Sequence, residues 1–259
     1  MNQINKKNWM WHLWDIIYPL LFYYAVLMFS FTAAKVLLGN ETSMYMYCQI
    51  IASAITLPVM YFNFYRVLYR KPREQKRQIG VYVAIIPIIL CLSIALNNII
   101  MMSPLVDISD GYREAASNFY GSVLLLEIIG SGILTPILEE LVFRGIVYGK
   151  LRSIMNMPVA IAISALLFAI IHFNVVQFVY AFFVGALLAI FIELTHDILS
   201  AIIGHMVANI FAVLRTEFDW ITFMVDRSVV AWITSVGLLV LGIILLFIVM
   251  KKGVKRDTI

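Results

Sequence analysis

The chain has 259 residues, of which 63% are hydrophobic and only 13% are charged, and its mean hydropathy is +0.93. Because this apolar share exceeds that of soluble domains, the composition excludes an ordinary soluble fold and predicts an all-α, polytopic membrane protein. The pI near 9.0 does not indicate nucleic acid as a partner, since the basic residues are distributed like membrane-flanking charge.

Apolar runs follow one another along the whole chain and predict about eight transmembrane helices. They lie near residues 13–38, 44–65, 79–103, 121–148, 158–173, 175–194, 198–214 and 228–250. The first run is too long for the apolar part of a signal peptide. The polar segment from Asp107 to Asn118 is expected to be a long loop. Eight spans leave little room for anything else, so residues 1–259 are expected to form one transmembrane domain.

The basic residues favour a cytoplasmic N-terminus, and eight spans then return the C-terminus to the cytoplasm. With this topology Arg113, Arg215 and Arg227 fall outside, with Lys35 near the outer end of the first span. The residues that fall inside are Lys6, Lys7, Arg66, Arg70, Lys71, Arg73, Lys76, Arg77, Lys150, Arg152, Lys251, Lys252, Lys255 and Arg256. This bias follows the positive-inside rule and predicts a multi-pass protein of the cell membrane.

Three clusters of polar side chains interrupt the later apolar runs. They are Glu139, Glu140 and Arg144 in the fourth run, His172 in the fifth, and His205 with Asn209 in the seventh. An ionisable residue at the centre of a membrane helix costs roughly 2.5 to 3.5 kcal/mol. Residues held at this cost are expected to have a function or a structural partner.

The fourth run predicts a division of roles between its two glutamates. On a helix, Glu140 and Arg144 are four residues apart and can form an ion pair on one face. Glu139 points about 100° away, so it remains as a carboxylate suited to general base and acid chemistry. The alternative is a Glu-Glu-Arg network that only locks helices together.

The fifth and seventh runs place imidazoles at comparable depths. Phe168 lies four residues before His172, so its ring is expected to shield the imidazole, although a lone histidine is also common as a hydrogen-bonded core residue. His205 and Asn209 share a face and supply an imidazole and an amide, which suits an oxyanion site or simply contacts between helices. At 1.5 Å per residue, all three clusters fall within about 10 Å of one another in depth. The shared depth favours one site.

Together, Glu-Glu-x-x-x-Arg, Phe-x-x-x-His and His-x-x-x-Asn on successive membrane helices resemble the CAAX prenyl endopeptidase and bacteriocin-processing (CPBP, or Abi) family. The family-like core covers about residues 121–214. The resemblance implies an intramembrane endopeptidase in which Glu139 activates a water with help from His172, and His205 with Asn209 stabilises the oxyanion. The supporting residues would be Glu140, Arg144 and Phe168.

The resemblance leaves the cofactor and the client open. We expect no cofactor to be required, while Glu139, His172 and His205 are the set that would bind Zn²⁺ if a metal is used. The expected partners are membrane lipids and a peptide or lipidated-protein substrate, including prenylated proteins. The alternative function is non-catalytic: bacteriocin self-immunity, or regulation of a membrane sensor. A proton-coupled transporter is disfavoured because the ionisable groups lie in one layer and no inverted repeat is visible.

Several further polar residues are expected to lie outside the site. Glu127 should lie near the opposite side of the membrane, and Asn97 with Asn98 should cap helices or join them. His196 and Asp197 are expected at a helix cap. An outer loop is expected to hold Arg215, Glu217 and Asp219.

Overall fold

The structure is a computed structural model that describes residues 6–39, 41–68, 79–119 and 122–254. These residues form helices, turns and bends without a β-strand, which confirms the all-α fold. The long helices are α1 (Lys6–Leu38), α2 (Tyr45–Phe64), α3 (Ile79–Met102), α9 (Val175–Thr195), α10 (Ile198–Glu217) and α11 (Val229–Val254). Short 3₁₀ turns lie at Thr42–Met44 and Thr222–Val225.

Within the described residues, these six helices are long and apolar enough to cross a membrane. The other two predicted spans are also helical but irregular. The fifth is α8 (Met157–Ile170), which has only 14 residues. The multi-pass membrane architecture is therefore confirmed, while the figure of eight spans counts one short helix and one interrupted helix.

The fourth span is a helix interrupted by two π-helical segments. It consists of α5 (Leu124–Glu127), a π segment (Ile128–Leu134), α6 (Thr135–Glu140), a second π segment (Leu141–Tyr148) and α7 (Gly149–Ile154). Such wide turns often mark functional sites in helices. Glu139 and Glu140 lie in the short α-helical stretch between the two π segments.

The prediction of a loop from Asp107 to Asn118 was wrong, because this region contains α4 (Asp110–Phe119). The polar and apolar residues of this segment fall on different faces of the helix, so its mean hydropathy is low although its periodicity is helical. Tyr112 and Ala115, three residues apart, face the interior of the bundle. The helix closes one end of the bundle rather than crossing it.

The outer loop predicted for Arg215 and Glu217 was also wrong. Helix α10 continues to Glu217, and only Asp219 follows it. The boundary before α10 is as expected: His196 takes the left-handed conformation that ends α9, and the Asp197 carboxylate accepts a hydrogen bond from the first turn of α10 at 3.1 Å.

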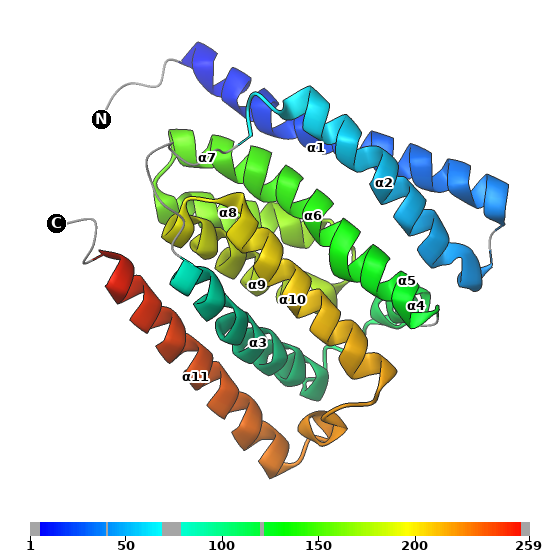
Figure 1. The fold of residues 1–259 in the computed structure, drawn as a ribbon, viewed down its shortest axis with the longest axis vertical. Helices are drawn as coiled ribbons and strands as arrows, with labels where there is room; N and C mark the ends of the chain where they lie inside the picture. The colour runs from blue at the N-terminus through cyan, green and yellow to red at the C-terminus, as the bar shows by residue number, and fades with distance from the viewer. Residues whose placement is uncertain (1–5, 40, 69–78, 120–121, 255–259) are drawn as a thin grey trace.

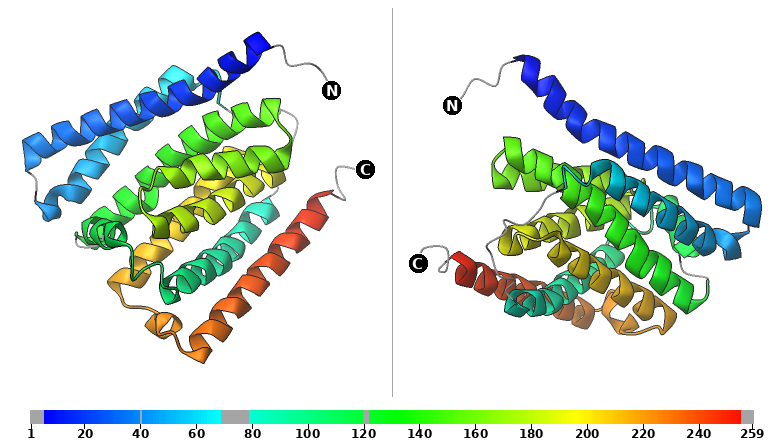
Figure 2. Two further views of the ribbon diagram at one scale, coloured as in Figure 1. Left: turned by 180° about the vertical axis from the view of Figure 1, so that it is seen from behind. Right: turned by 45° about the horizontal axis from the view of Figure 1, so that its top comes forward.

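The bundle has two outer pairs of helices around a central group. α11 packs along α3 at one edge and α1 along α2 at the other (Figure 1). Between them lie the fourth span, α8, α9 and α10, and both further views keep this order (Figure 2). Only 11% of the apolar stretch of α11 is buried inside the bundle, so most of the surface of this helix is available to lipid.

The first turns of α1 and the last turns of α11 lie at the same end of the bundle (Figure 1). At that end Lys150 Nζ lies 2.6 Å from Asp15 Oδ2. Of the inner residues predicted between Arg66 and Arg77, the structure describes only Arg66. The predicted inner residues that lie outside the described ones are Arg70, Lys71, Arg73, Lys76, Arg77, Lys255 and Arg256.

Candidate active site

The ion pair predicted in the fourth span is present and wholly buried. Arg144 Nη1 donates to Glu140 Oε1 at 3.0 Å, and both side chains are 0% exposed. Arg144 Nη2 donates to the carbonyl of Gly185 in α9 at 2.9 Å. The guanidinium also lies 4.4 Å from the centre of the Phe168 ring. A buried charge needs several such partners, so the arginine ties the fourth span to α8 and α9.

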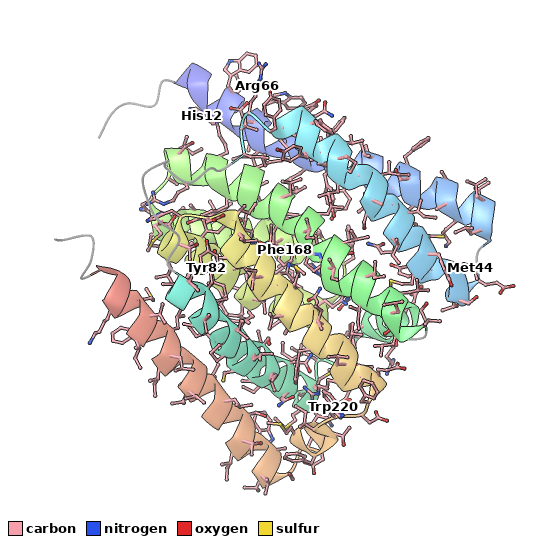
Figure 3. The ribbon with its side chains drawn as sticks, in the orientation of Figure 1. His12, Met44, Arg66, Tyr82, Phe168 and Trp220 are labelled. Carbon is pink, nitrogen blue, oxygen red and sulfur yellow. The ribbon has the colours of Figure 1, made fainter. Side chains whose placement is uncertain are left out.

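Phe168 links this ion pair to both histidines. Its ring centre lies 5.0 Å from that of His172 and 5.8 Å from that of His205, in edge-to-face geometry. The expected contact between Phe168 and His172 is present, and shielding of the imidazole from lipid stays a prediction. The side chain is buried and lies near the middle of the bundle (Figure 3).

His205 connects the two glutamates. Its Nδ1 lies 2.8 Å from Glu140 Oε1, and its Nε2 lies 3.8 Å from Glu139 Oε2. Because a carboxylate only accepts hydrogen bonds, Nδ1 carries the proton of this contact and the opposite ring nitrogen is directed at Glu139. Glu140 therefore serves both Arg144 and His205, a second role that spacing along one helix did not indicate.

Glu139 is the less buried of the two glutamates, with 13% of its side chain exposed. It faces a cavity rather than the Arg144 guanidinium. Tyr23 and Tyr24 of α1 lie close enough to interact electrostatically with its carboxylate. These tyrosines were missed, because the first span has no motif and aromatic residues in it have an adequate explanation as lipid-facing or core side chains.

His172 lies in the turn between α8 and α9, beyond the helix end at Ile170, whereas the sequence suggested that the helix extends past it. Its Nδ1 lies 2.9 Å from the Phe168 carbonyl, to which it donates. Nε2 is then the acceptor nitrogen. The carbonyl of His172 accepts from Asn174 Nδ2 at 3.1 Å, and Phe173 between them has a left-handed backbone with φ +55°.

Asn209 bridges α10 and the first π segment. Its Nδ2 donates to the carbonyl of Ser131 at 2.9 Å. An amide nitrogen has two protons, so one N–H is left for another acceptor. Asn209 thus makes a contact between helices, which was one of its two predicted roles. Its other predicted role, stabilisation of an oxyanion, stays a prediction.

Glu139, His172, His205 and Asn209 all line one cavity of about 510 Å³. Phe168 contributes to the same wall, and residues of α1, α2, α3, α4 and α9 also line the cavity. The structure thus brings together the four predicted catalytic residues from the fourth span, the α8–α9 turn and α10. The size of the cavity is within the range of small-ligand sites in proteins.

The next polar residues are those of the membrane helices that were expected to lie outside the site, and one of them lines the cavity. Glu127 is buried and accepts a hydrogen bond from the Ser122 backbone at 3.0 Å, away from the cavity. Asn98 joins helices, as predicted, by donating to Ser235 Oγ at 3.2 Å. Asn97 is the exception, because it lines the cavity.

The side chains that would bind Zn²⁺ do not lie in one group. In the part of the chain that the structure describes, no three His, Cys, Asp or Glu side chains are grouped so that they could hold a metal ion. The set Glu139, His172 and His205 is therefore not gathered into a metal site in this conformation.

Comparison with known proteins agrees with the motif region. Residues 121–211 match the family described as Type II CAAX prenyl endopeptidase Rce1-like. A curated relative, named "Putative membrane peptidase YdiL", from Bacillus subtilis (strain 168), is 35% identical over 89 residues. That match covers 34% of this chain and 36% of the relative, so it spans about a third of the length of each. No solved structure matches the chain.

All the motif residues, from Glu139 to Asn209, fall inside the matched segment. The family match and the motifs thus identify the same helices independently of the cavity geometry. Residues 121–211 are thus similar to the CAAX prenyl endopeptidase family over the segment that holds the motifs, and this similarity supports a membrane protease in general.

Proposed function

We propose that this protein is an intramembrane endopeptidase that hydrolyses a peptide bond of a membrane-associated peptide or prenylated protein. The observation that carries the proposal is the meeting of Glu139, His172, His205 and Asn209 around one cavity. In this proposal Glu139 is the general base, because its carboxylate faces the cavity and is not the one held by Arg144.

The reaction begins with a water held between Glu139 and the acceptor nitrogen of His172. Glu139 removes a proton as the water oxygen attacks the carbonyl carbon of the peptide, which gives a tetrahedral oxyanion. The C–N bond then breaks, and Glu139 returns the proton to the departing amine nitrogen. The products are a carboxylic acid and an amine, which become a carboxylate and an ammonium ion when the acid proton passes to the amine, so no other reactant is needed.

The oxyanion would be stabilised by His205 and Asn209. With the Glu140 carboxylate on Nδ1, a protonated His205 keeps an Nε2–H directed into the cavity. Asn209 adds its remaining amide proton. Hydrogen-bond donors fixed before the reaction are among the largest contributions to such catalysis, about 2.7 to 4 kcal/mol for one donor.

Glu140, Arg144 and Phe168 are positioning residues in this mechanism. Glu140 and Arg144 hold the fourth span against α9, and Glu140 also fixes the ring of His205. Phe168 covers one side of the histidines. None of the three needs to touch the substrate.

The proposed location is the cell membrane, with both termini in the cytoplasm. The positive-inside distribution of Lys and Arg supports this orientation, and so do the helix ends of α1 and α11 at one end of the bundle. Reporter fusions at the two termini and in the segment from Asp219 to Arg227 test it: cytoplasmic signals are expected from the termini only.

The central test uses Glu139→Gln, which keeps size and removes the base. Purified protein in detergent is incubated with a fluorogenic prenylated peptide. The variant should lose about 10²-fold to 10⁴-fold in turnover and keep its melting temperature. Glu217→Gln, at the exposed end of α10, is the matched control and should cleave like the wild type.

The same variant separates catalysis from the non-catalytic alternative. If cells carrying Glu139→Gln keep any protection against a bacteriocin that the wild type provides, binding without cleavage is the function. If turnover persists in the variant, Glu139 is not the base and the mechanism is wrong.

A further inference from the structure

A second cavity adjoins the candidate active site. Its volume is about 240 Å³, and it lies where α3, α10 and the segment after α10 meet. Four residues line both cavities: Asn97, Tyr112, Tyr180 and Ala212. Because these residues form a common wall, the second cavity lies directly beside the space that holds Glu139 and His205.

Arg215 is the basic residue of the second cavity, and its guanidinium is held in place. Nη1 donates to Asn98 Oδ1 at 2.7 Å and to Asn97 Oδ1 at 3.4 Å. Asn98 is fully buried, and its own amide nitrogen donates to Ser235 Oγ, which fixes the direction of its oxygen. Neutral amides therefore orient this cation without neutralising it.

The charge of Arg215 has no acidic partner within ion-pair distance among the residues that the structure describes. By contrast, Arg113, Arg144, Arg152 and Arg227 each pair with an Asp or Glu. Asp219 also lines the cavity, but it is exposed and forms no ion pair with Arg215.

Two nitrogens of the Arg215 guanidinium remain for a ligand. Within the described residues, Nε and Nη2 form no hydrogen bond, and the side chain is half-buried. A half-buried arginine that keeps free N–H groups at a cavity wall is suited to bind a carboxylate or phosphate by charge-assisted hydrogen bonds.

We propose that Arg215 binds the C-terminal carboxylate of the substrate peptide, an inference that rests on the proposed peptidase function. A peptide terminus suits the site better than a lipid phosphate because the second cavity adjoins the catalytic one and shares four lining residues with it. Arg215, Asn97 and Asn98 all lie outside the segment matched by the family. The site is therefore a feature of this chain beyond the shared motifs.

The geometry also limits where such a peptide would be cut. His205 and Arg215 are ten residues apart on α10, which is about 15 Å along the helix axis. An extended peptide covers that length with about four or five residues. The substrate class is thus a peptide whose scissile bond lies about four or five residues before a free C-terminus.

The test measures binding without turnover, in full-length protein carrying Glu139→Gln and purified in detergent. The probe is a fluorescently labelled, apolar hexapeptide prepared as the free acid and as the C-terminal amide, and its affinity is measured by fluorescence anisotropy. The acid should bind about tenfold or more tightly than the amide. Arg215→Gln should abolish this preference, and Arg215→Lys should keep part of it.

Arg227→Gln is the matched control, because Arg227 also follows the apolar part of α10 but pairs with Asp107 at 2.7 Å. It should leave the preference for the acid unchanged. If Arg215→Gln does not fold, the Arg215→Lys protein still tests the proposal, because its preference for the acid over the amide should be smaller than that of the protein with Arg215. Equal binding of acid and amide, or a preference that survives Arg215→Gln, would overturn the proposal.

A second measurement tests whether the anion bound by Arg215 is a lipid phosphate instead of a peptide carboxylate. Phosphatidylglycerol is added to the micelles, and the melting temperature of each variant is measured. An increase that depends on Arg215, together with equal binding of the two peptides, would assign the site to a lipid phosphate and overturn the peptide assignment. Absence of cleavage by the wild type with an intact preference for the acid would instead count against the proposed peptidase function alone.

Discussion

Nδ1 of His205 lies 2.8 Å from Oε1 of Glu140, although 65 residues separate the two in the chain. The same carboxylate oxygen accepts from Arg144. One glutamate oxygen thus holds together the fourth span and α10 and fixes which ring nitrogen of His205 faces the cavity. The orientation of the histidine depends on a residue outside the cavity wall.

The first prediction concerns this contact. Glu140→Gln should reduce the kcat of a cleaved peptide by about 10-fold to 100-fold with little change in KM, because the ring of His205 loses its charged partner. Glu127→Gln is the control, since Glu127 is a second buried glutamate of the same span that does not line the cavity. Equal losses in the two variants would mean that Glu140 acts only through stability.

The second prediction compares two arginines. Arg144→Met leaves Glu140 buried without its main partner, so it should lower the free energy of unfolding by about 3 to 5 kcal/mol. Arg113→Met removes an ion pair with Asp110 that is largely exposed, and should change stability little. Unfolding in mixed detergent micelles measures both, and a stable Arg144→Met protein would contradict the role assigned to the buried pair.

The third prediction concerns the approach of Arg144 to α9. A Cβ atom at Gly185 would lie 2.8 Å from Arg144 Nη2 and 3.1 Å from Phe168 Cδ1. Gly185→Ala should therefore destabilise the fold by about 1 to 3 kcal/mol and reduce turnover. Gly237→Ala, where no atom lies within 4 Å of the added carbon, should do neither. Matching melting temperatures for the two variants would refute the close packing.

The fourth prediction concerns metal. Since the donor side chains are not grouped into a metal site, dialysis against a strong chelator should leave the turnover of the fluorogenic peptide unchanged. Elemental analysis of the purified protein measures the zinc content directly. Stoichiometric zinc that disappears in His172→Ala and His205→Ala would assign the metal to these residues and replace the proposed water activation.

The sequence predicted those parts of the molecule that depend on one helix at a time. Long apolar runs are sufficient to locate the membrane helices, and a spacing of four residues is sufficient to pair Glu140 with Arg144. The motif residues also share a depth, which anticipated that Glu139, His172, His205 and Asn209 line one cavity. The roles of these four residues in catalysis stay predictions.

Contacts between helices could not be read from spacing. The bond from Arg144 to the Gly185 carbonyl and the position of Tyr23 beside Glu139 depend on how the helices rotate against each other. Helix α4 was missed because a polar amphipathic helix has the composition of a loop. The π segments leave no sign in hydropathy, since they change the backbone hydrogen bonds rather than the residue types.

The left-handed backbone of Phe173 has a consequence for the evolution of the site. A bulky residue in this conformation costs about 1 to 2 kcal/mol, and the ring gains little from packing because 84% of the residue is exposed. The strain sits directly beside His172, so a mutation that relieves it would also loosen the presentation of the imidazole. Stability and catalytic rate would then move in opposite directions under selection.

Phe173→Gly makes this trade-off measurable. Glycine adopts the conformation freely, so the variant should gain up to about 1 kcal/mol of stability, after allowance for its greater freedom when unfolded, while its kcat falls. A protein that becomes more stable at full activity would show that the turn is strained for no catalytic benefit. A protein that becomes more stable but has a lower kcat would show that the strained residue supports catalysis by keeping the turn before α9 rigid.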